Sequence, residues 1–156
     1  MKKLMLIVLC VATLLGAHME ISKDATCLIR KIKLYTAPEW AASIQVRSKK
    51  IAYFSSPKSM FEFYFQPGRW PEFNVKSEDD MRIDVTNFNT LEKIPAKEAY
   101  YVYGSSKISP AGDDLPAFSS KKEAEAFMQK YNGARVLDFS QVSDGLINLL
   151  NGRTRS

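Results

Sequence analysis

The sequence predicts an α+β fold: two tandem strand–strand–helix–strand units followed by a short C-terminal helix. The strongest observation is a ten-residue segment that recurs along the chain, at residues 54–63 and again at 118–127. Five of the aligned pairs are identical: Phe54/Phe118, Ser55/Ser119, Ser56/Ser120, Lys58/Lys122 and Phe63/Phe127. In each copy a strand ends in Phe, a Ser-Ser pair begins a helix, and the helix buries a second Phe. The pattern indicates one unit built twice, repeat one at residues 41–86 and repeat two at residues 99–139.

Repeat one should consist of strands at 41–47, 50–54 and 82–86, with a helix from 57 to 66 before the third strand. Ile44 and Val46 share one face of an alternating segment, which is the period of a half-buried strand. Ser56 is expected to be a helix N-cap with Pro57 at the first helical position, a sterically favoured combination. Residues 69–80 show no periodicity and are predicted to form a polar connection.

Repeat two should consist of strands at 99–103, 114–118 (interrupted by Pro116) and 134–139, with a helix that begins at 121. Ser120 and Glu123 have the spacing of a capping box, in which each side chain accepts a backbone N–H. Asn132 and Gly133 supply a left-handed stop for this helix. Residues 140–156 are predicted to form a short helix and a basic tail.

The first 17 residues have the pattern of an export signal peptide. Two lysines precede an uncharged run from Leu4 to Leu15, and small residues follow up to Ala17. The run is shorter than the roughly 20 apolar residues that span a bilayer, and nothing later resembles a transmembrane segment. A lipid anchor at Cys10 is disfavoured because Leu9 stands where a small residue belongs. We therefore expect export with cleavage after Ala17.

The remaining chain, about 139 residues, is long enough for one domain with a real core. Loss of two lysines lowers the formal net charge from +5 to +3. No basic run is interleaved with aromatic residues as a nucleic-acid groove requires, so no nucleic-acid partner is expected. Residues 18–40 are predicted to form a leader that carries the lone Cys27, with residues 18–26 polar and loosely held. One cysteine excludes an intramolecular disulfide.

Catalytic motifs are missing from the sequence. The only histidine, His18, adjoins the signal, so neither a Ser-His-Asp nor a Cys-His arrangement can occupy the core. The sequence has no glycine-rich phosphate loop, paired-cysteine zinc spacing or HExxH motif. The carboxylate pairs at 79–80 and 113–114 lie among polar loop residues and are interpreted as solvated charges. We therefore predict that the protein is not an enzyme.

Soft-metal binding is the remaining chemistry, because thiolate and thioether ligands select Cu(I). The candidate ligands are Cys27, His18 and Met19. After cleavage behind Ala17, the amine and ring nitrogen of His18 can chelate one copper ion together. The alternative is a polar leader in which His and Met are neighbours by chance. Met60 and Met128 lie on apolar helices and are interpreted as core residues.

Several segments in order resemble one family. They are residues 38–42, 51–65, 85–88, 94–105, 112–118 and 132–137. Together they resemble the NosL family, the accessory proteins of nitrous oxide reductase that carry Cu(I) in the periplasm. The resemblance covers roughly residues 26–140. It implies a fold of two small strand–strand–helix–strand units, a periplasmic location, and a protein partner among the components that mature nitrous oxide reductase.

The departures from the family fall on its metal site. NosL proteins usually carry Cys-x-x-Cys-Gly-Met, where this chain has Cys27-Leu28-Ile29-Arg30-Lys31-Ile32. The family's Gly-Pro-Met-Gly segment is here Ser109-Pro110-Ala111-Gly112. The usual Cys and Met copper ligands are therefore largely missing, and the positive charges of Arg30 and Lys31 beside Cys27 repel a cation.

Two functions stay open on these grounds. The first is a periplasmic accessory protein, related to the copper chaperones, with a reduced or rearranged Cu(I) site at Cys27, His18 and Met19. The second is a metal-free periplasmic module that kept the NosL-like domain, residues 41–139, to bind a protein partner. A third class, an enzyme related to the organomercurial lyases, requires several cysteines in one pocket and is disfavoured.

Overall fold

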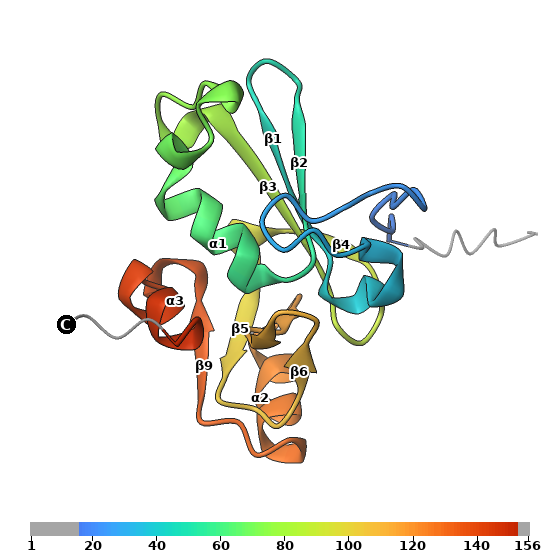
Figure 1. Ribbon diagram of the computed structural model, residues 1–156. Coiled ribbons are helices and arrows are strands. Elements are labelled where there is room, and N and C mark those ends of the chain that lie inside the picture. Colours follow the sequence, from blue (N-terminus) through green and yellow to red (C-terminus); the bar gives the residue numbers. More distant parts are fainter. Residues whose placement is uncertain (1–15, 153–156) are drawn as a thin grey trace, which may run out of the picture.

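Two antiparallel sheets, each with its own helix, form the body of the protein (Figure 1). The computed structural model describes residues 16–152. The predicted signal up to residue 15, the anchor position Cys10 and the tail at 153–156 therefore lie outside the described residues. Within the described range, no helix is both long and apolar enough to cross a membrane.

The first sheet has the strand order β2-β1-β3-β4. Its strands are β1 (Ala42–Val46), β2 (Ile51–Phe54), β3 (Met81–Thr86) and β4 (Lys93–Pro95). Ile44 and Val46 face the core from β1, while Ser43 and Gln45 are half-buried on the other face. Helix α1 (Pro57–Phe65) packs against β1 and β2. Its residues 57–63 are all buried, as the aromatic sequence predicts.

The second sheet has the order β8-β5-β9, and helix α2 lies against it. Its elements are β5 (Tyr100–Tyr103), β8 (Ala117–Phe118), α2 (Lys121–Lys130) and β9 (Arg135–Asp138). A hairpin of β6 (Ile108–Ser109) and β7 (Gly112–Asp113) lies between β5 and β8 in the chain, and α3 (Asp144–Leu150) packs on α1. The two sheets meet at a parallel bridge between Asn87 and Ala117.

The predicted α+β class and the order of the main elements are confirmed. In both halves the second, first and third strands lie side by side, β2-β1-β3 and β8-β5-β9. The predicted strand at 114–118 is reduced to two residues, because Pro116 has no N–H to donate to a ladder. That the halves are copies of one unit stays a prediction.

The predicted helix ends are also confirmed. The Ser56 hydroxyl accepts from Ser59 N–H at 3.4 Å, and the Ser120 hydroxyl accepts from Glu123 N–H at 3.2 Å. The return bond of the second cap goes to Ser119 N–H, one residue before the expected position. Asn132 has a φ of 55°, the left-handed conformation that ends α2.

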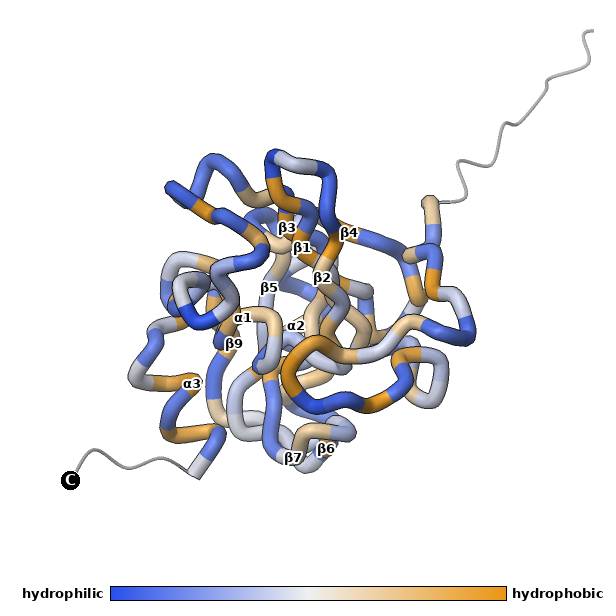
Figure 2. Tube along the Cα trace, turned by 45° about the horizontal axis from the view of Figure 1, so that its top comes forward, coloured by the Kyte–Doolittle hydropathy of each residue, from blue (hydrophilic) through white to orange (hydrophobic). Residues whose placement is uncertain are grey.

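The segment 18–40 is not loosely held, which corrects the prediction for its first half. Ala25, Cys27, Leu34 and Trp40 are buried, and several of its other apolar residues pack against the main core. Figure 2 shows apolar, orange stretches both within β1–β3 and in segments outside the sheets. The burial was missed because these residues follow neither a helical nor a strand period.

Short 3-10 turns join the main elements. They are η1 (Leu34–Thr36), η2 (Pro38–Trp40), η3 (Pro67–Arg69), η4 (Pro71–Phe73), η5 (Glu78–Asp80), η6 (Ala96–Glu98) and η7 (Phe139–Gln141). Two of them, η4 and η5, lie within the stretch 69–80, which was predicted to be an irregular polar connection. There Phe73 is buried against Phe63 of α1, with ring centroids 5.3 Å apart. The connection therefore contributes an aromatic side chain to the core, while most of its residues are exposed.

Candidate functional site

The loop that resembles the family's copper motif, residues 27–32, is a closed turn. Cys27 N–H donates to Ile32 O at 2.8 Å, and Lys31 N–H donates to Cys27 O at 3.0 Å. Lys31 has a φ of 59°. This left-handed conformation favours glycine, and Lys31 stands where the motif has Gly. The backbone of this turn therefore suits the motif's glycine, although the ligand side chains differ.

Cys27 is a free thiol with no exposed surface. Its Sγ accepts a hydrogen bond from Arg30 N–H at 3.3 Å. Leu28 N–H donates to Tyr53 O at 2.8 Å and so joins the turn to the edge of β2. A buried cysteine of this kind behaves as a small apolar residue. An ion could reach the sulfur only if the turn opened.

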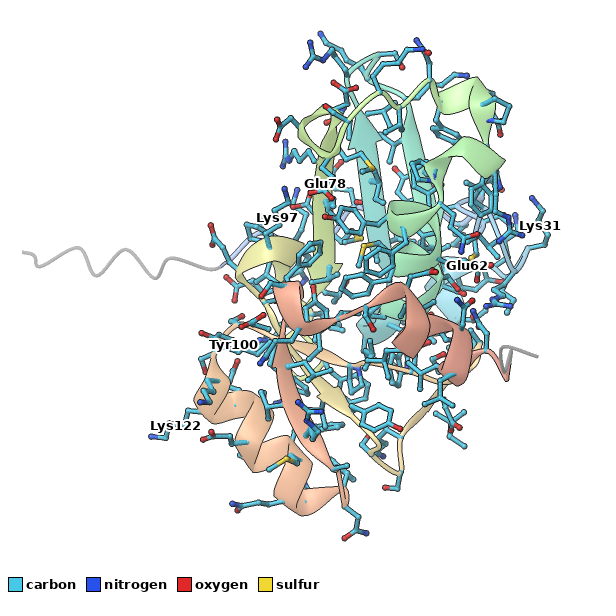
Figure 3. The ribbon with its side chains drawn as sticks, turned by 90° about the vertical axis from the view of Figure 1, so that its left-hand side faces the viewer. Lys31, Glu62, Glu78, Lys97, Tyr100 and Lys122 are labelled. Carbon is cyan, nitrogen blue, oxygen red and sulfur yellow. The ribbon has the colours of Figure 1, made fainter. Side chains whose placement is uncertain are left out.

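Arg30, at the position of the motif's second cysteine, reaches from the turn to α1 and to the end of α3. Its Nη2 lies 3.1 Å from Glu62 Oε2 and 2.6 Å from Asn151 Oδ1, and Nε donates to Ser59 Oγ at 3.4 Å. Glu62, only 2% exposed, also pairs with Arg69 Nη1 at 3.1 Å. Two guanidinium groups thus compensate one buried carboxylate, as a buried charge requires. Figure 3 labels Glu62 of α1 and Lys31 of the turn, which lie on the same side of that view.

Lys58, in the first turn of α1, is buried beside this ion pair. Its Nζ donates to Ala111 O at 2.6 Å and to Leu150 O at 3.3 Å. The pKa of Lys58 is lowered, chiefly because burial removes water from the ammonium group; the Asp114 carboxylate opposes the shift and Arg30 adds to it. The amine therefore links α1 to the β6–β7 hairpin and to the end of α3.

Asp114 is buried, which corrects its interpretation as a solvated loop charge. Its Oδ1 accepts from Lys58 N–H at 2.8 Å and Leu115 N–H at 2.9 Å, and its Oδ2 accepts from Ser109 Oγ at 2.7 Å. Burial raises the pKa of the Asp114 carboxyl, although hydrogen bonds such as that from Ser109 oppose the shift. The carboxylate organises the hairpin against α1.

Asp80, in the other carboxylate pair, is also largely buried. It accepts from the N–H groups of Lys76 and Ser77 and lies 2.8 Å from Arg47 Nε. The hydrogen bond from Lys76 N–H is the chief cause that holds the pKa of Asp80 below its ordinary value. Both carboxylates were misread because backbone N–H groups of turns replace the lost water.

His18 and Met19 lie beside β4. His18 forms an isolated antiparallel bridge with Glu92, and Lys93 N–H donates to Ala17 O at 2.8 Å. The pair lines two hollows of about 250 and 270 Å³. Other lining residues of the first hollow include Glu20, Gln45, Tyr53, Arg82 and Asp84, and those of the second include Ile21, Tyr35 and Pro38. Cys27 lines neither hollow.

The structure therefore brings two of the three predicted ligands together, and joint coordination by all three stays a prediction. Within residues 16–152, no group of three or more His, Cys, Asp or Glu side chains is placed to hold a metal ion. Met60 is fully buried in the core and Met128 packs against the second, smaller core cluster, as expected of core residues. The 27–32 turn does not fit Cu(I), because it offers one buried thiol and no second soft side chain among its six residues.

The charged residues of this site, Lys58, Glu62 and Asp114, were missed as functional candidates. A signal was available for the first two: they lie four residues apart in a helix whose other positions are mostly apolar. Such a pair is on one helix face and is buried only if partners cover it. Those partners come from distant segments, which the sequence does not place.

These elements define a class of protein: an α+β domain in which a cysteine turn packs against an aromatic helix, as in the NosL-type accessory proteins. The NosL family model matches residues 18–147, and the chain belongs to the NosL family. The match includes the segment predicted to be a leader.

The fold resembles a solved structure described as the copper chaperone NosL from Shewanella denitrificans. The TM-score is 0.67 at 21% sequence identity, and the match covers 83% of this chain and 98% of that chain. At this identity the likeness establishes the fold, which confirms the predicted NosL-like architecture. A comparison with curated proteins gives no match.

Proposed function

We propose that this protein is an exported, periplasmic accessory protein that acts by binding a protein partner and does not hold Cu(I) at its 27–32 turn. The ion pair between Arg30 and Glu62 carries the proposal. It fills the position of the motif's second cysteine with a fixed cation, 3.1 Å from a buried carboxylate. A copper ion at Cys27 would have to replace the Arg30 N–H on the sulfur and would find no second cysteine in the turn.

The energetic argument favours the closed, metal-free turn. Cu(I) needs two or three soft donors, and Cys27 offers one. Breaking a buried ion pair by removing one partner typically costs about 3–5 kcal/mol, because a buried charge is left uncompensated. Glu62 keeps Arg69 as a second partner, which lowers this cost but does not supply a ligand. The turn is therefore a structural element in this chain.

The partner is expected among the periplasmic proteins that mature a copper enzyme, with nitrous oxide reductase as the case that the family resemblance implies. The family scaffold supports this view, since the match extends over nearly all of the described chain. We predict no catalytic activity.

A Cu(I) competition titration against a chromogenic chelator tests the proposal, on protein exported and processed to its natural N-terminus. The expected result is no retention by the wild type against a chelator of modest affinity, with Cys27→Ser as the matched control behaving identically. One tightly held equivalent that vanishes in Cys27→Ser would overturn it. Sequencing the mature N-terminus tests export, with His18 expected as the first residue.

A second candidate function is copper binding at the processed N-terminus. The observation that favours it is the placement of His18 and Met19 together at two surface hollows, away from the Arg30 ion pair. The amine and imidazole of an N-terminal His18 would hold the ion. Copper retention should then be lost in His18→Ala and in a protein with Gly-Ser added before His18, and kept in Cys27→Ser. Retention that survives the Gly-Ser extension would rule out chelation by the amine.

A further inference from the structure

Two cations, the half-buried Arg30 and the buried Lys58, contact the same segments. Arg30 joins the 27–32 turn to Ser59 and Glu62 of α1 and to Asn151 after α3. Lys58 joins α1 to the hairpin through Ala111 O. It also reaches the last carbonyl of α3, at Leu150. Their charges influence each other, since Arg30 contributes to the lowered pKa of Lys58.

Two of the three positions at which this chain lacks a ligand of the family motifs, Arg30 and Ala111, take part in these contacts. Arg30 replaces the second cysteine of one motif. Ala111 replaces the methionine of the other, and its carbonyl oxygen accepts from Lys58 Nζ at 2.6 Å. Gly112 has a φ of 91°, a backbone conformation that other residues rarely adopt, and it permits the turn that carries Ala111. Two of the replaced ligand positions and the two cations therefore belong to one cluster.

We infer that Arg30 and Lys58 take the structural place of a metal ion in this chain and hold the 27–32 turn, the β6–β7 hairpin and the end of α3 against α1 without copper. The inference rests on the proposed function. It adds that the two side-chain cations replace the ion. We call Arg30, Lys58 and their acceptors on Ser59, Glu62, Ala111, Leu150 and Asn151 the cation clamp.

The charges of the clamp account for its stability and for its resistance to another cation. The acceptors at the end of α3 are unpaired helix carbonyls and a cap side chain, where positive charge is favourable. Glu62 supplies a full negative charge, shared by Arg30 and Arg69. An added Cu(I) would bring another positive charge into a cluster that already contains these cations and Lys58.

Hydrogen exchange of α3 measures the clamp directly. In Arg30→Met and in Lys58→Met, we expect the amides of residues 147–151 to exchange at least about tenfold faster than in the wild type. This factor corresponds to the loss of one charge-assisted hydrogen bond. The amides of β1 and β3 should keep their protection. Lys122→Met, at the equivalent position of the second half, is the matched control and should change neither region.

Arg30→Lys covers the case in which Arg30→Met does not fold. It keeps the charge but cannot bridge Glu62 and Asn151 with one planar group, so it should also accelerate exchange in α3. Unchanged protection of α3 in the folded variants at positions 30 and 58 would overturn the inference, even if the wild type binds no copper. The two proposals therefore fail separately.

A rebuilt variant supplies the complementary gain of function. It combines Arg30→Cys, Lys31→Gly, Ile32→Met and Ala111→Met, with Lys58→Met to remove the second cation. Without metal, its α3 should be poorly protected, and one equivalent of Cu(I) under reducing conditions should restore protection and raise the Tm. The wild-type Tm should not respond to Cu(I). A rise of the wild-type Tm with Cu(I) that disappears in Cys27→Ser, or a rebuilt α3 that is fully protected without Cu(I), would contradict the inference.

Discussion

The two copies of the ten-residue segment fold alike and differ in what covers them. Lys58 and Lys122 occupy equivalent positions in the two copies. Lys58 is nevertheless only 2% exposed, whereas Lys122 is exposed to solvent. Figure 3 shows Lys122 reaching away from α2. Glu62 is buried in the first copy, where the second has the exposed Ala126.

This difference arises from tertiary packing rather than from the helices themselves. The 27–32 turn, the hairpin and α3 all cover α1, through the contacts of Arg30 and Lys58. Helix α2 buries only Ala124 and Phe127. The same local sequence is thus a solvated helix start in one half and the centre of a polar cluster in the other. We therefore expect function in the first half, where the 27–32 turn, the hairpin and α3 cover α1.

The largest effect should come from exchanging the residues at positions 62 and 126. Glu62→Ala removes the carboxylate that Arg30 and Arg69 share, and should lower the free energy of unfolding by about 3 kcal/mol, the upper end for hydrogen bonds to a charged group, because several such bonds are lost together. Ala126→Glu places a charge on an exposed helix position and should change it by less than about 0.5 kcal/mol. Urea unfolding of both variants measures the difference. Equal effects would mean that the two copies are not distinguished by their covering.

A smaller effect is expected at the two lysines. Lys58→Met keeps the length of the side chain but leaves Ala111 O and Leu150 O without their donor. The loss should be about 1–3 kcal/mol, the cost of an unsatisfied buried group. Lys122→Met should lie within about 0.5 kcal/mol of the wild type. Thermal unfolding of both variants at constant pH compares the two. A Lys58→Met variant as stable as the wild type would show that water replaces the amine as donor.

The pH dependence of stability should report on Asp114, which holds the hairpin against the first copy. Because its pKa is raised in the folded protein, the folded state binds more protons than the unfolded state as the pH rises from the ordinary value of 3.8. The contribution of this carboxyl is therefore present at low pH and is lost as the pH rises through the folded pKa.

Asp114→Asn cannot titrate and isolates this contribution. The unfolding free energy of the wild type minus that of Asp114→Asn should be largest at low pH and should fall as the pH rises from about 4. Denaturant unfolding between pH 3.5 and 8 measures it. A difference that instead grows with pH would show that hydrogen bonds to the ionised carboxylate outweigh its burial.

The sequence was informative where structure is local. Alternation at Ile44 and Val46, the caps at Ser56 and Ser120 and the left-handed Asn132 each depend on a few neighbouring residues, and all were predicted. Burial was missed where it depends on distant partners. The partner of Arg30, Glu62, lies on another element, so a charged residue of a loop pairs with a buried carboxylate in the fold.

The same limit explains the candidate metal ligands. Cys27, His18 and Met19 are neighbours in the sequence, and proximity along the chain suggested one site. The chain instead turns Cys27 into the core beside β2 and pairs His18 with Glu92 before β4, where His18 and Met19 line hollows that Cys27 does not line. Sheet order, which sequence separation does not reveal, decided which residues meet.

The smallest effect should come from two left-handed residues, Lys31 in the 27–32 turn and Asn132 after α2, with φ values of 59° and 55°. This conformation destabilises the folded protein by roughly 1–2 kcal/mol for a residue with a Cβ. For Gly the cost is instead an entropy loss on folding of about 0.5–1 kcal/mol. Lys31→Gly should therefore stabilise the protein by about 0.5–1 kcal/mol. Asn132→Gly should gain less, because Asn tolerates this conformation better than Lys. Thermal unfolding compares the two; a Lys31→Gly variant that loses stability would show that the Lys31 side chain, whose Nζ donates to Leu28 O at 2.7 Å, holds the turn closed.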